Sequence, residues 1–296
     1  GICGVAAGIG VFRGILSSTP TIRLSDVVAV GEATIVYDRE GNEIDQYVST
    51  NSNRLSVGMD EIPDYMGKAF VAIEDERFYQ HNGIDFKSII RAGYQFFKTG
   101  GEEAQGASTI TQQLLKNTVF TDWTSEGNNK IKKIKRKIQE QYLALEITKY
   151  YSKDEILLRY MNAINLGQNT LGVESASLRY FGKHCSELTI SECAVIASIT
   201  QNPSKYNPIR HPEENVKRRK KCLTKMLELG FITQAQYDEA MADTDAVYER
   251  IGLYDIDYQE ANATTGSYFS DAVYEQVKQD LILAGYNETM AETLLT

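Results

Sequence analysis

Apolar residues at helical spacing dominate the sequence beyond Pro63 and limit the chain to a mainly α-helical fold. Met66, Ala69, Phe70 and Ile73 recur at intervals of three and four, which places their side chains on one face of a helix. Further helices are predicted by capping boxes, in which a hydroxyl residue is followed three positions later by Glu or Gln. These boxes are Ser152–Glu155, Thr189–Glu192 and Thr233–Gln236.

The first part of the chain departs from this helical pattern. Ala33–Tyr37 is a β-type run, and Asn42–Val48 predicts a return strand after a turn. Farther along, Pro212 opens a helix that stops at Gly230. We therefore expect four parts, which are a membrane-anchor remnant over 1–20, an extended and β lead-in over 21–62, a helical domain over 63–246, and an acidic linker with one helix over 247–296.

The anchor is inferred from Gly1–Phe12, a stretch that carries no charge. As a helix it would reach about 18 Å, less than the roughly 30 Å hydrocarbon core of a membrane. Because the chain does not begin with Met, we interpret the stretch as the outer end of a signal anchor. A loop of small residues, or a short buried helix, is the alternative.

Charge is distributed unevenly along the chain. The net charge is −9 overall, but −11 within residues 231–296 and +2 in the remainder. Basic residues gather at 130–137 and 217–221, and two such clusters favour a phosphate-bearing partner over a merely solvated helix face. The four cysteines form no C-x-x-C pair, which excludes structural zinc and a disulfide scaffold.

One basic cluster lies on a predicted amphipathic helix over residues 130–149. Arg136 and Glu140 share a face opposite an apolar stripe, and Arg before Glu is the weaker order for a helical ion pair, worth only a few tenths of a kcal/mol. A carboxylate among cations therefore indicates a site for an anionic ligand, with a simple salt bridge as the alternative. The apolar stripe consists of Ile131, Ile134, Ile138, Tyr142 and Leu145.

Two other segments carry groups that could take part in catalysis. Glu74 ends an apolar helix, where a partly desolvated carboxylate can serve as a general base, although an ordinary solvated Glu is the alternative. Gly106–Asn117 combines small residues, hydroxyls and a helix start, so its backbone N–H groups predict a seat for an anion. Gln112, Gln113 and Lys116 add side-chain donors there; the alternative is a plain helix cap at Ser108.

These groups together fit glycosyl transfer from a phosphorylated donor. Two carboxylates flanking a sugar bond are the usual machinery of glycosyl chemistry. Cations that face a phosphorylated leaving group stabilise the negative charge it acquires. The sequence supplies both, because Glu74 and Glu140 lie on different predicted helices and basic residues surround the second.

The segments also resemble, in order, five motifs of a known family, the peptidoglycan glycosyltransferase domain of class A penicillin-binding proteins (glycosyltransferase family 51). The resemblance covers roughly residues 33–243. Arg219, in the fifth motif, is expected to be structural. The matching segments are Glu74–Gly83 (E-D-x-x-F-x-x-H-x-G), Gly106–Gln113 (G-A-S-T-x-T-Q-Q), Arg136–Glu140, Lys153–Gly167 and Arg218–Met226.

The resemblance implies a lysozyme-like α fold with two lobes, the smaller one apposed to the membrane. Glu74 would deprotonate the 4-hydroxyl of a lipid II acceptor, which attacks C1 of the growing chain with inversion and expels undecaprenyl pyrophosphate. Glu140 would support the leaving diphosphate, with Mg²⁺ or Mn²⁺ as an optional partner and no cofactor required. The cations Lys116, Arg136 and Lys137 would neutralise the diphosphate, and Ser108, Thr109, Gln112 and Gln113 would bind donor or acceptor groups.

The same resemblance implies partners and a location. The expected partners are lipid II, the growing glycan strand, the membrane and other cell-wall synthesis proteins, at the extracytoplasmic face of a cell membrane. Gly266–Phe269 resembles the lead into a transpeptidase domain, so we expect part of a bifunctional, single-pass anchored protein. No nucleic-acid-binding module fits the basic clusters.

Two alternatives remain open. A lytic transglycosylase or muramidase would share the fold, but it releases an uncharged sugar and does not need Lys116, Arg136 and Lys137 to converge. A non-catalytic scaffold that binds lipid II would not need Glu74 and Glu140, and both are present.

Overall fold

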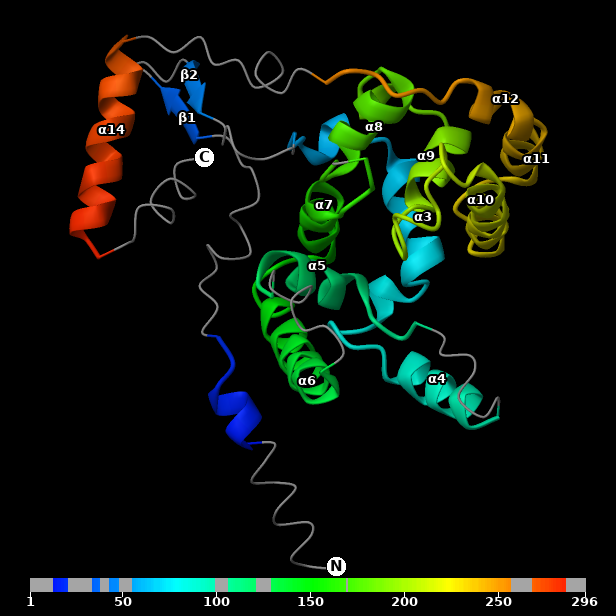
Figure 1. Ribbon diagram of the computed structural model, residues 1–296, viewed down its shortest axis with the longest axis horizontal. Coiled ribbons are helices and arrows are strands. Elements are labelled where there is room, and N and C mark those ends of the chain that lie inside the picture. The colour runs from blue at the N-terminus through cyan, green and yellow to red at the C-terminus, as the bar shows by residue number, and fades with distance from the viewer. Residues whose placement is uncertain are drawn as a thin grey trace, which may run out of the picture. The chain divides into compact units, whose positions relative to one another are not determined.

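A computed structural model describes residues 13–20, 34–37, 43–47, 55–98, 106–120, 129–168, 170–256 and 268–285 (Figure 1). Most of these residues are helical, which confirms the predicted fold class. The helices are α3 (Asp64–Glu74), α4 (Phe86–Lys98), α5 (Ile110–Thr118), α6 (Lys130–Ile147), α7 (Lys153–Ala163), α8 (Val173–Phe181), α9 (Ile190–Ala197), α10 (Pro212–Glu228), α11 (Gln234–Ala242), α12 (Thr244–Glu249) and α14 (Tyr268–Leu283).

The predicted hairpin near the N-terminus is confirmed. Strands β1 (Thr34–Tyr37) and β2 (Glu43–Tyr47) pair antiparallel, with an irregularity in the register between Val36 and Tyr37. The predicted capping boxes are also confirmed. Thr189 caps α9 and Thr233 caps α11, and each hydroxyl accepts a hydrogen bond from the backbone N–H of the residue three positions later. These elements follow from local chemistry, and the structure places them where the sequence predicts.

The chain divides into two compact units, each built from two separate stretches. The first unit comprises residues 1–27 and 70–160, and the second comprises 28–69 and 161–296. Two units agree with the predicted two-lobed architecture, whereas the predicted division at residues 20, 62 and 246 stays a prediction. Gly1–Phe12 lies outside the described residues; within the described part of the chain, no helix is long and apolar enough to cross a membrane.

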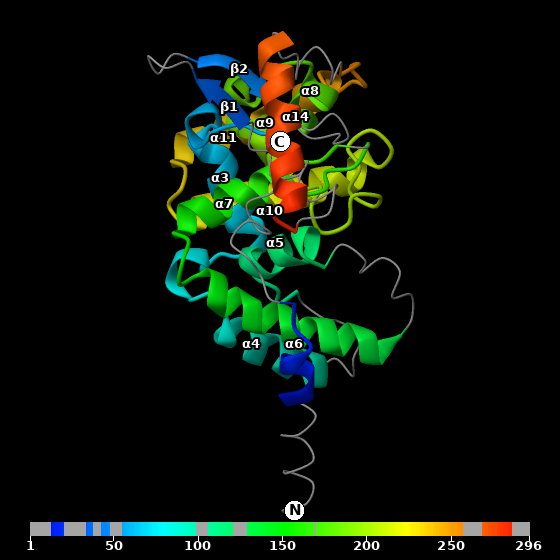
Figure 2. The same cartoon turned by 90° about the vertical axis from the view of Figure 1, so that its left-hand side faces the viewer.

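In the first unit, α5 and α6 lie side by side (Figures 1 and 2). Leu114 and Leu115 of α5, and Leu143 and Ile147 of α6, are buried. A fully buried aliphatic side chain stabilises a fold by about 1.5–3 kcal/mol, so these residues hold the two helices that carry most of the predicted site.

The apolar stripe predicted on α6 is the exposed face of the helix, not the buried one. Ile131, Ile134, Tyr142 and Leu145 are exposed, while the buried face carries Glu140 and its neighbours. An apolar stripe usually faces the core. Here Glu140 lies on the buried face, and its ion pairs with Arg136 and Lys137 compensate for the burial of its charge.

Gly83 brings the loop after α3 into close contact with α6. Its φ of +87° is in the left-handed region, and a Cβ at this position would lie 2.2 Å from the carbonyl oxygen of Ala144. Real Cβ atoms do not come this close to a backbone oxygen. Gly83 is therefore required both by its own backbone conformation and by the approach of the helix.

Gly83→Ala should lower the free energy of unfolding by about 2–4 kcal/mol, because left-handed backbone strain adds to a clash with rigid main chain. Urea unfolding followed by circular dichroism measures the loss. Gly230→Ala is the matched control, since Gly230 also has a positive φ (+70°) but a Cβ at its position would meet no atom within 4 Å. Equal losses in the two variants would show that the contact with Ala144 costs nothing.

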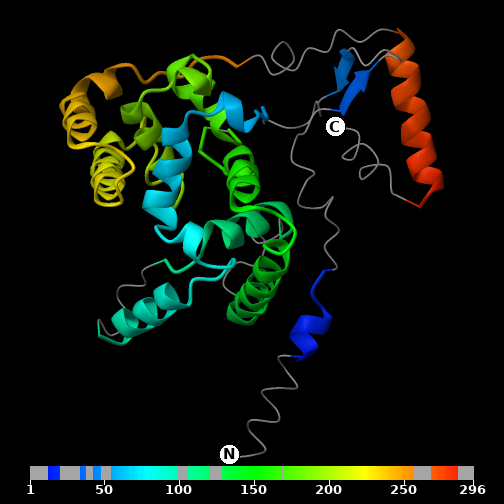
Figure 3. The same ribbon diagram turned by 180° about the vertical axis from the view of Figure 1, so that it is seen from behind.

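In the second unit, α9, α10 and α11 lie next to one another (Figures 1 and 3). Arg219 of α10 is fully buried among them. Its guanidinium donates to the Ser191 hydroxyl (2.7 Å), the Thr244 hydroxyl (3.0 Å), and the carbonyls of Ser191 (3.4 Å) and Ala240. Arg219 thus joins α9 and α10 to the segment around α11 and α12, which confirms its expected structural role.

Candidate active site

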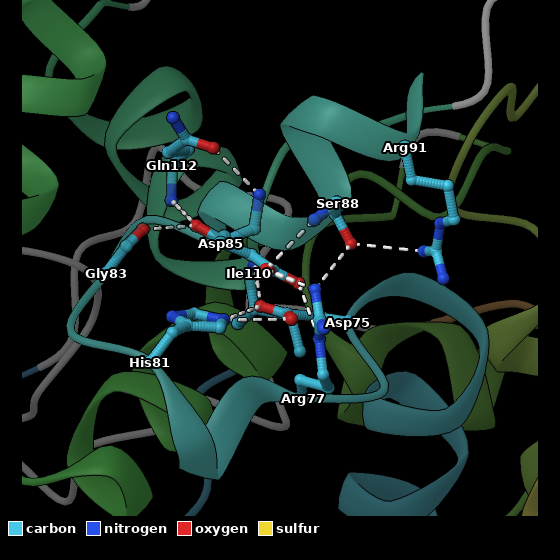
Figure 4. Close-up of polar contacts among 10 residues, drawn as sticks. Asp75, Arg77, His81, Gly83, Asp85, Ser88, Arg91, Ile110 and Gln112 are labelled. Carbon is cyan, nitrogen blue, oxygen red and sulfur yellow. Dashed lines mark hydrogen bonds and ion pairs between the residues drawn. The ribbon is translucent and has the colours of Figure 1, made fainter. Parts of the chain in front are cut away.

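The loop after α3 is organised around the carboxylate of Asp75 (Figure 4). Buried Asp75 accepts a hydrogen bond from the backbone N–H of Ile110 (3.0 Å) and lies 2.9 and 3.0 Å from Nε2 of His81. Ile110 is the first residue of α5. The helix start that we predicted as a seat for a ligand anion is therefore occupied by the protein's own carboxylate.

Thr109, rather than Ser108, caps α5. Its hydroxyl accepts from the N–H of Gln112 (3.2 Å) and donates to the carbonyl of Gly83 (2.7 Å), while the Gln112 amide oxygen accepts from the N–H of Thr109 (2.8 Å) (Figure 4). Both side chains are buried. These contacts make Thr109 and Gln112 part of a capping box, and their predicted contact with substrate stays a prediction.

A partly buried ion pair fixes the following loop to the start of α4. Arg77 donates to Asp85 through Nε (3.1 Å) and Nη2, and the Ser88 N–H donates to the same carboxylate (3.1 Å) (Figure 4). Burial disfavours ionisation of Asp85, but the hydrogen bonds from Arg77 and Ser88 outweigh it and hold its pKa well below the usual range. The chain between α3 and α4 is thus held at both ends by carboxylates.

Glu74, the last residue of α3, faces α5. The Gln113 amide Nε2 donates to Glu74 Oε2 at 2.9 Å. Glu74 is half-buried, so the residue is oriented by Gln113 without being fully enclosed. This is a suitable position for a general base, which has to be both oriented and accessible.

The predicted pairing around Glu140 is present. Glu140 is fully buried and accepts hydrogen bonds from Arg136 and, at 2.7 Å, from Lys137 Nζ, which also donates to the Ser108 hydroxyl (3.0 Å). Lys137 is 42% exposed, whereas Arg136 is mostly buried. We refer to Lys116, Arg136, Lys137 and Glu140 as the cationic cluster; its three positive side chains outnumber the single carboxylate.

Helix α5 contributes a residue to this cluster and another to the contact with Glu74. Burial, then the charges of Lys137 and Arg136, lower the pKa of Lys116, and Glu140 partly opposes them. Lys116 lies three residues after Gln113 on α5, and residues at this spacing share one side of a helix. A single helix therefore places one donor on Glu74 and one cation in the cationic cluster.

The residues present do not fit a divalent cation at Glu140. Both of its carboxylate oxygens accept hydrogen bonds, one from Arg136 and the other from Lys137. Across the described segments, no group of three or more His, Cys, Asp or Glu side chains could hold a metal ion. Bound Mg²⁺ usually takes carboxylate oxygens and water, whereas the carboxylate oxygens of Glu140 face two cations.

Sequence reasoning missed several residues that hold the site. It named no individual role for Asp75, His81, Lys153 or Tyr160, although all lie within the matched motifs. Lys153 Nζ lies 4.4 Å from the centre of the Phe78 ring, a cation–π arrangement, and burial lowers its pKa. Membership of the matched motifs was the one sequence feature that could have indicated these residues. Contacts between residues far apart in the chain leave no local sequence pattern.

A family model and several known proteins match most of this chain. A family model described as Transglycosylase matches residues 40–227. Penicillin-binding protein 1A of Clostridium botulinum strain Hall is 39% identical over 288 residues, which are 95% of this chain and 33% of that protein. Penicillin-binding protein 1A of Clostridium perfringens strain 13 is 40% identical over 276 residues, covering 90% of this chain and 39% of that protein.

More distant relatives were also found. Penicillin-binding protein 1A/1B of Bacillus subtilis strain 168 is 35% identical over 279 residues, which are 94% of this chain and 29% of that protein. A crystal structure of penicillin-binding protein 1A from Haemophilus influenzae covers 88% of this chain and 26% of that chain, with 21% identity and a TM-score of 0.41. That structural likeness is too weak to bear on the fold.

The chain spans about a third of the length of the curated relatives that it matches. Within that span the family model extends over the Glu74 loop, α5, the cationic cluster and most of α10. The resemblance read from the five motifs is thereby confirmed, and the chain belongs to the transglycosylase family.

Proposed function

We propose that this chain polymerises lipid II into the glycan strands of peptidoglycan by inverting transfer. The observation that carries the proposal is the placement of Gln113 and Lys116 one turn apart on α5. Gln113 orients Glu74, and Lys116 belongs to the cationic cluster. A base and a phosphate-binding site are thus supplied together, as a sugar transfer with a diphosphate leaving group requires.

Glu74 would act as the general base. Its carboxylate takes the proton of the acceptor's 4-hydroxyl as that oxygen forms a bond to C1 of the growing chain's terminal sugar. The bond from C1 to the diphosphate oxygen breaks on the opposite face, and its electron pair leaves with undecaprenyl pyrophosphate. One displacement without a covalent enzyme intermediate inverts the configuration at C1.

The cationic cluster would stabilise the departing diphosphate. Arg136 and Lys137 are held in place by Glu140, so they are preorganised before the negative charge develops, which is the condition under which electrostatic stabilisation is most effective. The number of cations supports a charged leaving group. A lytic enzyme, which releases an uncharged sugar, gains little from such a cluster.

Incubation of the chain with labelled lipid II in detergent tests the proposal. Gel-resolved polymer together with released undecaprenyl pyrophosphate is the expected result. Shortening of preformed glycan strands would instead establish a lytic enzyme. Lipid II binding without turnover would establish a scaffold.

A pH dependence follows from the lowered pKa of Lys116. Since Lys116 loses its proton at a lower pH than an ordinary lysine, affinity for inorganic pyrophosphate should fall as the pH rises toward the range in which ordinary lysines titrate. Lys116→Arg keeps its charge over this range and should remove most of the decline. Titration calorimetry at several pH values measures both proteins, and parallel declines would assign the effect to another group.

We also propose that the first unit contacts the extracytoplasmic surface of a cell membrane, where its lipid-linked substrate and other cell-wall synthesis proteins would be found. Phe86, Ile90 and Tyr94 are spaced by four residues along α4 and are 65%, 73% and 68% exposed. The exposed Ile131 and Ile134 on α6 add further apolar surface. Contiguous exposed apolar residues favour an interface with an apolar partner.

Replacing Phe86, Ile90 and Tyr94 together by Ser should reduce binding to phospholipid vesicles by about tenfold or more, because each side chain would lose apolar burial in the bilayer. Vesicle flotation measures the bound fraction. Leu253→Ser removes an exposed apolar side chain of the second unit and serves as the control. Unchanged flotation of the triple variant would place the membrane contact elsewhere.

A further inference from the structure

Tyr160 of α7 is joined to Glu74 by a chain of two hydrogen bonds. The Tyr160 hydroxyl donates to the Gln113 amide oxygen at 3.2 Å, and the Gln113 amide nitrogen donates to Glu74 Oε2 at 2.9 Å. Tyr160 is fully buried. Its ring meets that of Phe70 edge to face, with centres 5.5 Å apart and planes at 87°.

The chemistry of the amide gives this chain a direction. An ionised carboxylate can only accept hydrogen bonds, so Glu74 requires the NH₂ end of Gln113. The opposite end is then an oxygen, which needs a donor. The phenolic hydroxyl of Tyr160 supplies that donor. A flipped amide would turn its oxygen toward the Glu74 carboxylate, where two acceptors would face each other.

The position of the Tyr160 hydroxyl is itself fixed. A fully buried aromatic ring that packs edge to face against another has little freedom to move. Phe70 lies on α3, four residues before Glu74 on the same helix. The helix that ends in Glu74 thus supports the tyrosine that orients the glutamine.

We propose that Tyr160 is a positioning residue for Glu74 and acts through Gln113. The inference rests on the proposed function, in which Glu74 is the base. Without the Tyr160 hydroxyl, the Gln113 amide can rotate, and Glu74 loses the donor that holds its orientation toward the acceptor. Transfer then slows, whereas lipid II binding does not change, because Tyr160 is fully buried and offers the substrate no surface.

Tyr160→Phe removes only the hydroxyl and keeps the ring contact with Phe70. It should lower kcat for lipid II polymerisation by about tenfold and leave KM unchanged, which corresponds to about 1.4 kcal/mol at the transition state. Gln113→Ala should lower kcat at least as much. Since Tyr160 acts through Gln113, the double variant should be no slower than Gln113→Ala alone.

Tyr180→Phe is the matched control. It removes another buried tyrosine hydroxyl, which donates to the carbonyl of Leu166 at 2.7 Å in the second unit. This variant should lose stability and retain kcat. Should Tyr160→Phe behave in the same way, or should its effect add fully to that of Gln113→Ala, Tyr160 is merely structural and the inference is overturned.

Side-chain amide NMR provides a readout independent of turnover. In protein labelled with ¹⁵N-glutamine, the Gln113 amide signal is identified by its absence from Gln113→Ala. It should shift in both Tyr160→Phe and Glu74→Gln, and an unchanged signal in Tyr160→Phe would refute the hydrogen-bond chain.

The two measurements separate the inference from the proposed function. A shifted signal with no polymerisation by the parent chain would overturn the base role of Glu74 and, with it, the positioning role of Tyr160. Polymerisation by the parent that is abolished in Glu74→Gln but complete in Tyr160→Phe would overturn only the inference.

Discussion

Glu74→Gln should lower kcat for lipid II polymerisation by about a thousandfold, within the range that a general base contributes. The amide has the shape of the carboxylate but cannot take a proton from the acceptor hydroxyl. Glu74 is half-buried, and its amide oxygen as Gln can still accept from Gln113. The fold and the KM for lipid II should therefore persist, and the loss should appear in kcat.

Glu76→Gln provides the control for this result. Glu76 is also half-buried and lies two residues away, where it pairs with Arg91 at 3.3 Å. Continuous assay of lipid II consumption, at substrate concentrations that separate kcat from KM, compares the two variants. If Glu74→Gln retained the parent kcat, or lost affinity at unchanged kcat, another group would have to be the base.

Arg219→Met should lower the free energy of unfolding by about 3–5 kcal/mol, a large part of the 5–15 kcal/mol that stabilises an ordinary domain. Met fills similar space but donates no hydrogen bond. The carbonyls of Ser191 and Ala240 and the hydroxyl of Thr244 would lose a buried donor. Each buried polar group left without a partner costs about 1–3 kcal/mol.

Urea denaturation of the two proteins measures this difference. Lys220→Met changes the next residue of the same helix, where the side chain is exposed, and should alter the unfolding free energy by less than about 0.5 kcal/mol. A loss in Arg219→Met no larger than in this control would mean that the network contributes nothing.

Local sequence patterns predicted the elements well, because caps and turns depend on residues close in the chain. Thr189 and Thr233 cap their helices as predicted, and Pro212 begins α10. The face of α6 was not predictable in this way. Periodicity shows which residues share a face but not which face meets the protein, and here Glu140 is inside while Ile131 is outside.

The site was predicted in its residue types more than in its contacts. Motif order indicated Glu74, Gln113 and the cationic cluster, and in the structure α5 contributes Gln113, which donates to Glu74, and Lys116, which belongs to the cluster. The occupation of the α5 start by Asp75 was missed, because that carboxylate lies 35 residues before Ile110. Tyr160 reads as an ordinary core residue of an amphipathic helix until its partner on another helix is known.

The interleaved composition of the two units affects how the chain can be made and dissected. Residues 55–57 donate hydrogen bonds to Ser175 and Asn162, which lie 120 and 105 positions later. During synthesis on the ribosome, Leu55 and Val57 can make these contacts only after Ser175 and Asn162 have been added to the chain, and contacts of such long sequence separation slow folding. No single cut through the polypeptide separates the two units, because each is built from two separate stretches of the chain.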